Sequence, residues 1–228
     1  FYENAMMNLN IIHHAYLNKI EKIISTGTVS SYPEKSKMPL RENDLWKGYP
    51  ETMSASYGIA KRIIHTHSIS YKKQYNFKSI LVLLTNLYGP NDNFNPKSSH
   101  VIASLIKKVS DAKKNKKKVI EVWGRGNTTR DFAYIDDIAC GLVLVAKKYN
   151  KIDPINLASG KETSIKELVK MISQIFNYKV KIKWLKNKPI GFKKRYSNIK
   201  LAKKLGFKPT KNLKQGLIKT INWYKKNN

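Results

Sequence analysis

The feature that most constrains the fold is a continuous apolar run, Ser79–Leu84 (SILVLL), which leads directly into a loop at 86–96 rich in Gly, Pro, Asn and Asp. A strand that is buried on both faces reads as an unbroken apolar run, whereas a half-solvated strand alternates apolar and polar residues. The run therefore predicts a central strand of a parallel sheet covered by helices. Its loop would leave the sheet at the edge where open α/β sheets bind their ligands.

Helical and strand-like patterns alternate on both sides of this run, which is typical of an α/β protein with a mainly parallel sheet. Before it, apolar spacing predicts helices over Tyr2–Leu17 and from Ser54 to about Tyr75, with a buried strand at Lys22–Ser25 between them. After it, the patterns predict a helix over Val101–Ala112, a strand over Val119–Val122, a helix over Ile135–Lys148, a strand over Ile155–Leu157, a helix from the capping box Ser164–Glu167 to about Phe176, a strand over Lys179–Trp184, and helices over Ser197–Leu205 and Leu213–Lys225.

Basic residues greatly outnumber acidic ones, and the chain of 228 residues carries a formal net charge of +29. Such a charge is compatible with a nucleic-acid partner. However, 39 of the 44 basic residues are Lys, and recognition of base edges and phosphates favours Arg. We therefore interpret the charge as a solvated Lys-rich surface and expect no nucleic-acid partner. A basic cleft for a polyanionic small substrate stays open as an alternative.

The cysteine content and the apolar runs bear on location. The single cysteine, Cys140, excludes an intramolecular disulfide and a Cys-based zinc site, and it fits a reducing compartment. The longest apolar runs are far shorter than a membrane span. We expect a cytoplasmic protein that contacts no membrane. We expect no metal site either, because the histidines outside the candidate site, His13, His14, His65 and His67, have spacings that give no shared helix face.

The pair Tyr57 and Lys61 is the strongest candidate for chemistry. Four residues apart on a predicted helix, the two side chains share one face. A phenol has an ordinary pKa of about 10, which is high for a proton donor at neutral pH. A neighbouring ammonium stabilises the phenolate, so that such a pair can donate a proton to a carbonyl that is being reduced. The spacing alone is common by chance, and two surface polar groups on an amphipathic helix are the alternative.

The surroundings of this pair strengthen the interpretation. Thr28 stands at the carboxyl end of the strand that precedes the helix, and Asn86 follows the apolar run Ser79–Leu84. Because parallel strands end at the same edge of a sheet, both residues are expected at the ligand-binding edge. A hydroxyl at that edge can donate a hydrogen bond to a substrate carbonyl.

These motifs together resemble the extended short-chain dehydrogenase/reductase family, also called the NAD-dependent epimerase/dehydratase family. The residues that carry the resemblance are Thr-x-x-x-Tyr-Pro from Thr28, Tyr-x-x-x-Lys from Tyr57, Asn-Leu-Tyr-Gly-Pro-Asn-Asp-Asn-Phe from Asn86, Ser-Ser-His-Val-Ile around His100, Trp123-Gly124-x-Gly126, Arg130-x-Phe132, Asp136-Asp137 and Lys188-Pro189-x-Gly191. Tyr-x-x-x-Lys marks only the superfamily. The Asn86 and His100 motifs look most like those of members that reduce, and in part epimerise, GDP-4-keto-6-deoxy sugars with NADPH.

The resemblance implies a role for each residue of the catalytic set. Tyr57 would donate the proton to the C4 oxygen of the sugar, Lys61 would stabilise the phenolate and bind the nicotinamide ribose, and Thr28 would polarise the C4 carbonyl. His100 matches the epimerisation acid of the family. Further NADPH contacts are implied for Leu84, Asn86 and Leu87.

The resemblance also implies a set of residues that bind the GDP-sugar substrate. Lys108, Arg130 and Lys188 match basic groups near the sugar nucleotide, with Arg130 facing its diphosphate. Trp123 and Asn86 would contact the substrate as well. Each has a plainer interpretation: Arg130 as a structural partner of a neighbouring Asp, the two lysines as members of a Lys-rich surface, and His100 as an ordinary polar residue at a helix start.

One departure from the family concerns the cofactor. The family begins with a strand and a Gly-x-x-Gly-x-x-Gly turn that binds the cofactor diphosphate at a helix N-terminus. The sequence contains no such motif. The absent part would be roughly 80 residues, a little over two βαβ lengths. We expect the chain to be part of a longer enzyme and to bind NADPH negligibly by itself; calorimetry that shows micromolar binding would contradict this. A non-catalytic fragment is the alternative.

A second departure concerns epimerisation. The family pairs a Cys with the His, and Ser30 stands at the position of that Cys. A thiol has an ordinary pKa of about 8.5 and forms a thiolate, whereas an unassisted hydroxyl is a far weaker base. We predict reduction at C4 with weak or absent epimerisation. Another nucleotide-sugar epimerase or C4-reductase of the same family is the alternative. A dehydratase is disfavoured, because Val29-Ser30 stands where dehydratases would carry an Asp-Glu pair.

The predicted organisation follows from the same resemblance. The fold class is α/β, with a partial Rossmann-like parallel sheet and a smaller α+β substrate-binding domain. We expect residues 1–90 to form the C-terminal part of the Rossmann-like domain and 91–228 mainly the substrate-binding domain, with about 131–157 returning to the first. The family typically forms homodimers through helices that correspond to Tyr2–Leu17 and 54–75.

Overall fold

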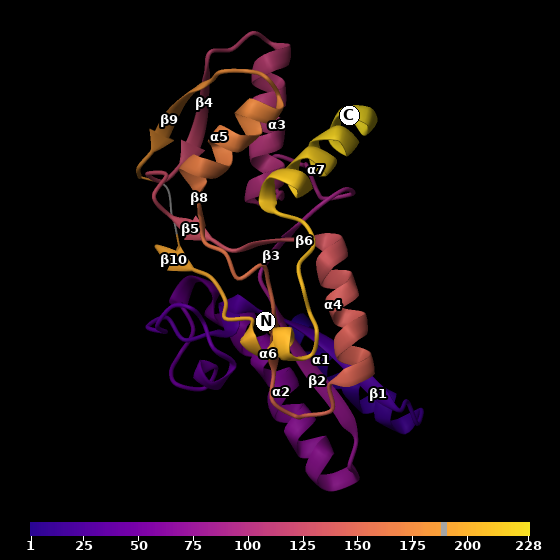
Figure 1. Cartoon of the computed structure of the whole chain (residues 1–228). Helices are drawn as coiled ribbons and strands as arrows, with labels where there is room; N and C mark the ends of the chain where they lie inside the picture. Colours follow the sequence, from indigo (N-terminus) through magenta and orange to yellow (C-terminus); the bar gives the residue numbers. More distant parts are fainter. Residues whose placement is uncertain (188–190) are drawn as a thin grey trace. The chain divides into compact units, whose positions relative to one another are not determined.

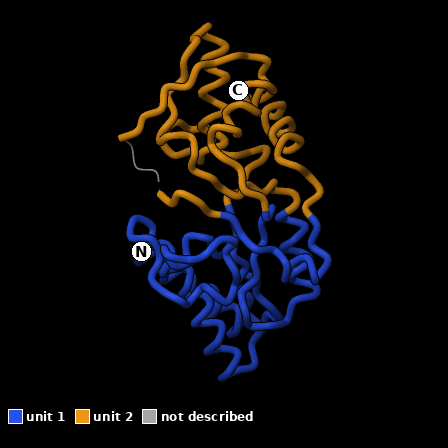
Figure 2. Tube along the Cα trace, turned by 60° about the vertical axis from the view of Figure 1, so that its left-hand side comes forward, with its two compact units in different colours: residues 1–85, 138–160, 196–208 blue, residues 86–137, 161–195, 209–228 orange. Residues whose placement is uncertain are grey.

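The computed structural model describes residues 1–187 and 191–228 (Figure 1). The chain divides into two compact units (Figure 2). Unit 1 comprises residues 1–85, 138–160 and 196–208, and unit 2 comprises residues 86–137, 161–195 and 209–228. The functional domain ranges 1–90 and 91–228 stay a prediction.

Unit 1 is built on a three-stranded parallel sheet with the order β1-β2-β7. The strands are β1 (Lys22–Thr28), β2 (Lys78–Leu84) and β7 (Ile155–Leu157). Thr28 lies opposite Leu84, and Leu84 lies opposite Leu157. β2 is the central strand and is buried along most of its length, as its unbroken apolar run predicts. The three strands end together, so residues that follow them meet at one edge.

The prediction of a buried strand at Lys22–Ser25 is wrong in length and in burial. β1 continues to Thr28, and its first four residues are only partly buried while Thr26 is exposed. Among the strands that the structure describes in this sheet, β1 pairs with β2 alone. An edge strand has a covering neighbour on one side only, which accounts for the partial exposure.

Two long helices of unit 1 pack against each other: α1 (Tyr2–Leu17) and α2 (Ala55–Tyr75). Both match the predicted ranges. A buried amide of Asn8 on α1 donates a hydrogen bond to the carbonyl of Ala60 on α2 over 3.0 Å. The apolar core beside them includes Ile12, Ile64, Leu81 and Leu83.

Two further helices lie mainly or wholly in unit 1. α4 (Ile135–Lys148) has the predicted range. α6 (Lys200–Lys204) is shorter than the predicted Ser197–Leu205. It begins later because Ser197 pairs with Leu40 in an isolated bridge, and the side-chain oxygen of Asn198 accepts the Lys200 N–H, a turn that competes with helix.

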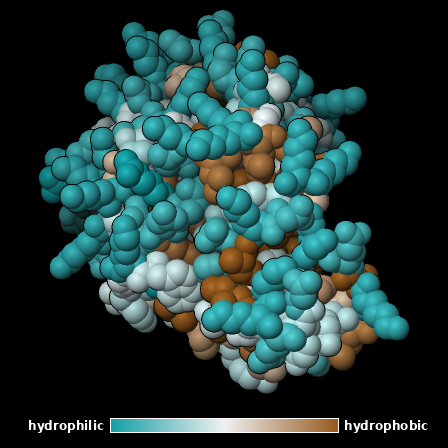
Figure 3. Space-filling view, turned by 60° about the horizontal axis from the view of Figure 1, so that its bottom comes forward, coloured by the Kyte–Doolittle hydropathy of each residue, from teal (hydrophilic) through white to brown (hydrophobic). Residues whose placement is uncertain are grey.

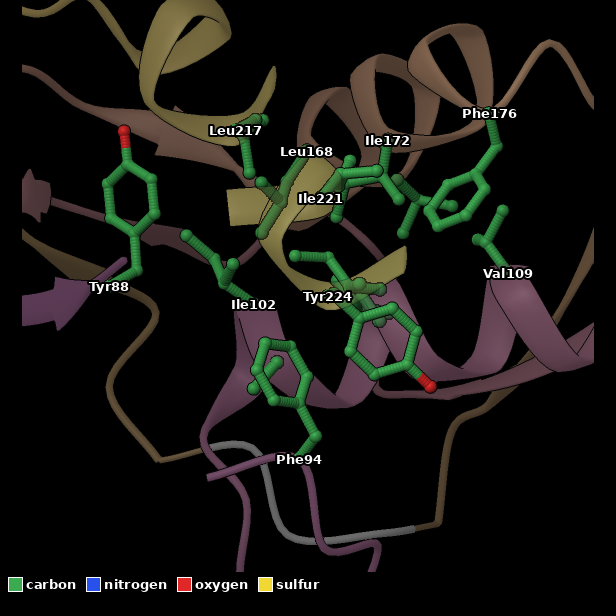
Figure 4. Packing of buried hydrophobic residues seen from close by; sticks show 14 of the residues in the cluster. Tyr88, Phe94, Ile102, Val109, Leu168, Ile172, Phe176, Leu217, Ile221 and Tyr224 are labelled. Atoms are coloured by element: carbon green, nitrogen blue, oxygen red, sulfur yellow. The ribbon is translucent and has the colours of Figure 1, made fainter. Parts of the chain in front are cut away.

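In unit 2, three helices enclose one apolar core: α3 (Val101–Lys114), α5 (Ile165–Ile175) and α7 (Leu213–Asn227). Figure 4 shows how side chains from these helices and from neighbouring segments converge. The labelled core members are Tyr88, Phe94, Ile102, Val109, Leu168, Ile172, Phe176, Leu217, Ile221 and Tyr224. The predicted capping box is confirmed, since Ser164 and Glu167 exchange both hydrogen bonds at the start of α5.

In the described part of unit 2, the strands are short and form three small sheets. β3 (Asn86–Tyr88) pairs with β6 (Phe132–Tyr134), and β4 (Val119–Trp123) pairs with β9 (Lys181–Leu185), both in parallel. β5 (Thr129–Arg130) lies between β10 (Lys194–Arg195) and β8 (Thr163–Ser164). The predicted loop at 86–96 therefore begins with a strand.

The surface reflects the Lys-rich composition. The face shown in Figure 3 is covered mostly by hydrophilic side chains, with apolar side chains exposed between them. In the part of the chain that the structure describes, no helix combines the length and the apolar character needed to cross a membrane.

Candidate active site

The Thr28 turn, residues 28–31, leaves the sheet of unit 1 at the carboxyl end of β1. Val29–Ser31 form a short 3-10 helix, and the Thr28 side chain caps it by accepting the N–H of Ser30 over 3.2 Å. The capping bond uses the acceptor side of the Thr28 hydroxyl. The hydroxyl proton can therefore be donated to a ligand at this edge.

Tyr57 and Lys61 lie in the first two turns of α2, on the shared face that their spacing predicts. Tyr57 is 45% exposed. Lys61 is partly buried, and this desolvation lowers the pKa of its ammonium. Among the described residues, no carboxylate forms an ion pair with Lys61. The pair thus combines an accessible phenol with a partly desolvated cation, as proton donation to a carbonyl requires.

Hydrogen bonds hold the Thr28 turn against this part of α2. Ser31 donates from its hydroxyl to the carbonyl of Gly58 over 3.1 Å. Arg62 Nε donates to the carbonyl of Ser31 over 2.7 Å. The two α2 residues in these bonds, Gly58 and Arg62, directly follow Tyr57 and Lys61 in the sequence. The turn and the Tyr57–Lys61 pair are therefore neighbours in unit 1.

Gly58 allows the helix to approach the turn this closely. A Cβ at this position would lie 2.5 Å from the carbonyl oxygen of Ser30, closer than real Cβ atoms approach backbone. Any other residue would push the turn away from α2. The glycine thus serves close packing between the two segments that carry the candidate catalytic groups.

The far side of the turn is held in the core of unit 1. Val29 and Tyr32 are almost fully buried among apolar side chains. The Tyr32 hydroxyl donates to the side-chain oxygen of Asn156 over 2.8 Å, and burial raises the pKa of this phenol well above its ordinary value. Leu84, predicted to contact the cofactor, ends β2 directly opposite Thr28. Thr28, Ser30 and Leu84 are thus fixed at one edge.

Sequence reasoning missed Ser31, Gly58 and Arg62. Gly58 carried a signal, because an isolated glycine inside a helical pattern is unfavourable and usually has a packing reason. The other two carried none, since their bonds join segments about thirty residues apart in the chain, with a sequence separation of 27 for Ser31–Gly58 and 31 for Arg62–Ser31.

In unit 2, Lys108 and Trp123 line one open groove of about 550 Å³. Lys108 Nζ donates to the carbonyl of Glu121 over 2.9 Å. Desolvation lowers the pKa of this ammonium, and the Glu121 charge opposes that effect. Trp123 is 58% exposed at the end of β4. Lys97, Lys107 and Asp111 line the same groove, and Lys107 forms an ion pair with Asp111 over 3.2 Å. The lysines still outnumber the carboxylate among these lining residues, beside an exposed indole.

The other predicted residues of unit 2 lie on separate elements. Asn86 on β3 donates from its side-chain amide to the carbonyl of Asp131 over 3.1 Å, next to Leu87. Arg130 Nη1 donates to two backbone carbonyls, those of Thr129 (2.7 Å) and Phe192 (2.6 Å).

His100 is exposed and precedes α3, where its side chain makes no capping bond. The prediction for Lys188 lies outside the described residues. No group of His, Cys, Asp or Glu side chains in the described ranges could hold a metal ion.

The donors of unit 1 fit one end of a nicotinamide cofactor. A partly buried ammonium without a counter-charge and an exposed phenol are suited to ribose hydroxyls and to a carbonyl oxygen. None of the eleven glycines of the sequence belongs to a Gly-x-x-Gly-x-x-Gly turn that could bind a cofactor diphosphate. The described residues therefore fit the nicotinamide end alone.

Residues 1–158 match the family model described as "NAD dependent epimerase/dehydratase family". The chain belongs to this family. The match includes the Thr28 turn and the Tyr57–Lys61 pair, and it extends through β7.

Known epimerase/dehydratase family proteins are similar over nearly the whole chain. GDP-L-fucose synthase 1 of Arabidopsis thaliana is 33% identical over 224 residues, which are 98% of this chain and 69% of that protein. Among solved structures, a GDP-6-OMe-4-keto-L-xylo-heptose reductase from C. jejuni has a TM-score of 0.93 at 28% identity, covering 100% of this chain and 76% of that one. A GDP-L-fucose synthetase from Naegleria fowleri bound to NADP has a TM-score of 0.90 at 29% identity, with 98% and 72% covered. The fold is therefore the Rossmann-like α/β fold of nucleotide-sugar epimerases and reductases.

Proposed function

We propose that the protein is an NADPH-dependent reductase of a GDP-4-keto-6-deoxy sugar, with or without C3/C5 epimerisation, in nucleotide-sugar biosynthesis. The observation that carries the proposal is the hydrogen-bonded contact between the Thr28 turn and the Tyr57–Lys61 turn of α2. Similarity to a GDP-L-fucose synthase and to a GDP-keto-heptose reductase supports the substrate class.

The residues of the chain would each do one part of the reduction. NADPH, when bound, supplies a hydride to C4 of the sugar. The hydroxyls of Thr28 and Tyr57 donate hydrogen bonds to the C4 oxygen, where negative charge develops. Tyr57 then transfers its proton to that oxygen, and the ammonium of Lys61 stabilises the phenolate that remains.

The direct test uses protein expressed from the complete reading frame. Incubation with GDP-4-keto-6-deoxy-mannose and NADPH should oxidise NADPH and yield a GDP-sugar with a new C4–H bond. Deuterium from labelled NADPH should appear at C4 alone. No oxidation with this substrate or with a GDP-4-keto-heptose would contradict the proposal.

Ser30 favours a second form of the function, reduction at C4 without epimerisation. Epimerisation requires proton abstraction beside the ketone, and a serine hydroxyl is a much weaker base than a thiolate. In heavy water without NADPH, we expect little deuterium uptake at C3 and C5 of the substrate. Ser30→Cys should raise that uptake by at least about tenfold, because the pKa of a thiol is much closer to neutral than that of a hydroxyl. Rapid uptake by the unmodified protein would refute this form.

The GDP part of the substrate would be bound by unit 2. The groove of Lys108 and Trp123 offers positive charge and an exposed indole, which suit a diphosphate and a base or sugar face. We assign Asn86 to the sugar pocket and Arg130 to the diphosphate, together with Lys188, and His100 to proton exchange during any epimerisation.

Cofactor and partner assignments complete the proposal. NADP is favoured over NAD by the similar structure that holds NADP, and Leu84, Asn86 and Leu87 would contact it. A homodimer through α1 and α2 is supported by apolar side chains exposed on α1, among them Met7 (54%) and Ile11 (55%). We expect the cytoplasm as the location.

A further inference from the structure

We propose that Arg62 is a positioning residue for this reaction: it holds the Thr28 turn at a fixed distance from the Tyr57–Lys61 pair. The inference rests on the proposed reductase function. Arg62 directly follows Lys61 in the sequence, but it lies on a different face of α2, and its Nε bonds to the carbonyl of Ser31 in the turn.

Arg62 joins three segments of unit 1 through one side chain. Its Nε donates to the carbonyl of Ser31 over 2.7 Å, and its Nη1 donates to the carbonyl of Gly48 over 2.9 Å. Its guanidinium also lies over the indole ring of Trp46, 5.3 Å from the centroid. The turn, the loop at 46–48 and the catalytic helix are therefore held together by a rigid, planar group.

The charge of Arg62 is buried without a counter-charge. The residue is only 5% exposed, and none of the described carboxylates forms an ion pair with it. Its Nη2 is buried and meets no acceptor in the described part of the structure. A buried, unpaired cation costs free energy that an apolar side chain would avoid. Its presence is explained if the two carbonyl bonds keep the turn in a geometry that the reaction needs.

By holding the turn, Arg62 would fix the distance between the Thr28 hydroxyl and the Tyr57 phenol. Both groups must reach the same C4 oxygen, and small displacements of such donors lower the rate steeply. Without Arg62, the Ser31–Gly58 bond and the buried side chains of Val29 and Tyr32 still anchor the turn. The Ser31 carbonyl, however, loses its bond from α2, so the Thr28 hydroxyl would more often lie too far from the shared oxygen.

The experiment compares Arg62→Gln, Arg62→Lys and a matched control, Ser68→Ala. Ser68 is buried in the same helix and bonds to Ser79, away from the turn. Two quantities are measured: steady-state kinetics of 4-keto sugar reduction by protein from the complete reading frame, and amide hydrogen exchange at Ser30 and Tyr32. The Tyr32 N–H, bonded to Val29 over 3.2 Å, reports directly on the turn.

For Arg62→Gln we expect kcat to fall by at least about tenfold, KM for the nucleotide sugar to stay within about threefold, and the turn amides to exchange at least about tenfold faster. Arg62→Lys should lie between this variant and the unmodified protein, because one ammonium can reach one carbonyl but not both in the same geometry. Ser68→Ala should leave kcat and the turn amides within about twofold.

Two outcomes would overturn the proposal. Exchange in Arg62→Gln no faster than in Ser68→Ala would show that Arg62 does not hold the turn. Faster exchange with unchanged kcat would show that holding the turn does not serve the reaction. If the unmodified protein reduces no GDP-4-keto sugar, the proposed function fails, and the exchange comparison still decides whether Arg62 holds the turn.

Discussion

The Thr28 turn of unit 1 and the Lys108–Trp123 groove of unit 2 hold their polar groups in opposite ways. In the turn, Ser31 is fully buried and is bonded through both its hydroxyl and its carbonyl. In the groove, Trp123 is more than half exposed, and Lys108 is held by one bond to a backbone carbonyl.

The difference fits the task that we propose for each region. Proton transfer needs donors fixed within a fraction of an ångström, whereas attraction of a polyanion tolerates mobile side chains. We therefore expect changes near the turn to lower kcat, and changes in the groove to raise KM. Each prediction below can break or sharpen that contrast.

The largest effect is expected for Tyr57→Phe, which removes the proposed proton donor. General acid catalysis contributes roughly 10²- to 10⁴-fold, so kcat should fall by about that factor. The binding of the nucleotide sugar should change little, because the phenol would contact only the reacting end of the substrate. Tyr75→Phe is the matched control, since Tyr75 lies on the same helix with nearly the same exposure, 47% against 45%. Steady-state kinetics of both variants check the prediction, and a parallel loss in both would contradict it.

Lys61 should give the next largest effect and a pH signature. Burial lowers the pKa of its ammonium, so the charge that we propose stabilises the phenolate is lost at a lower pH than for an ordinary lysine. Activity should therefore decline as pH rises through that lowered pKa. Lys61→Met should lower kcat by about ten- to hundredfold.

Lys61→Arg separates charge from shape. A guanidinium stays protonated at high pH, so any remaining activity should persist to higher pH than in the unmodified protein. A pH–rate profile measures this, with exposed Lys73→Met as the control. An alkaline limb in Lys61→Arg identical to that of the unmodified protein would exclude Lys61 as its source.

Gly58→Ala tests how closely the helix and the turn are packed. On an exposed helical surface this change would stabilise the protein by about 1 kcal/mol. Here the new Cβ would meet the Ser30 carbonyl, so we expect destabilisation by about 1–3 kcal/mol and a lower kcat. Denaturant unfolding measures the first and kinetics the second. Ser56→Ala, at an exposed site on the first turn of α2, should stay within about 0.5 kcal/mol of the unmodified protein.

The two units also differ in how much of their structure could be predicted from the sequence. The long elements were predictable, because the 3.6-residue period of α2 and the unbroken apolar run of β2 are local patterns. The strands β3, β5, β6, β8 and β10 have two or three residues each, too few to show a period. They exist because of partners distant in the chain.

The same reasoning applies to the candidate site. Tyr57 and Lys61 were predictable from their spacing, and Thr28 from its place at the end of a strand. Arg62 was not, because its bonds to Ser31 and Gly48 depend on the folded arrangement of three segments. In unit 2, only the resemblance to a family pointed to Lys108 and Trp123, and the structure adds that they line one groove.

The smallest effect is expected in that groove. Lys108→Ala and Trp123→Ala should each raise KM for the nucleotide sugar by about three- to tenfold and leave kcat nearly unchanged, because the groups would bind substrate and transition state equally. Exposed Lys114→Ala on the same helix is the control. A fall in kcat with unchanged KM would place the groove in the chemistry and break the contrast.

The central claim, that Thr28 and Tyr57 act on one oxygen, is tested most directly by a double-mutant cycle on the hydride-transfer rate. Single-turnover reduction of the 4-keto sugar would be measured for Thr28→Val, Tyr57→Phe and the double variant. Residues that act as a unit have non-additive effects, so the double variant should be almost as fast as Tyr57→Phe alone. If the fold-loss in rate of the double variant equals the product of the two single fold-losses, the two residues act independently and the claim is contradicted.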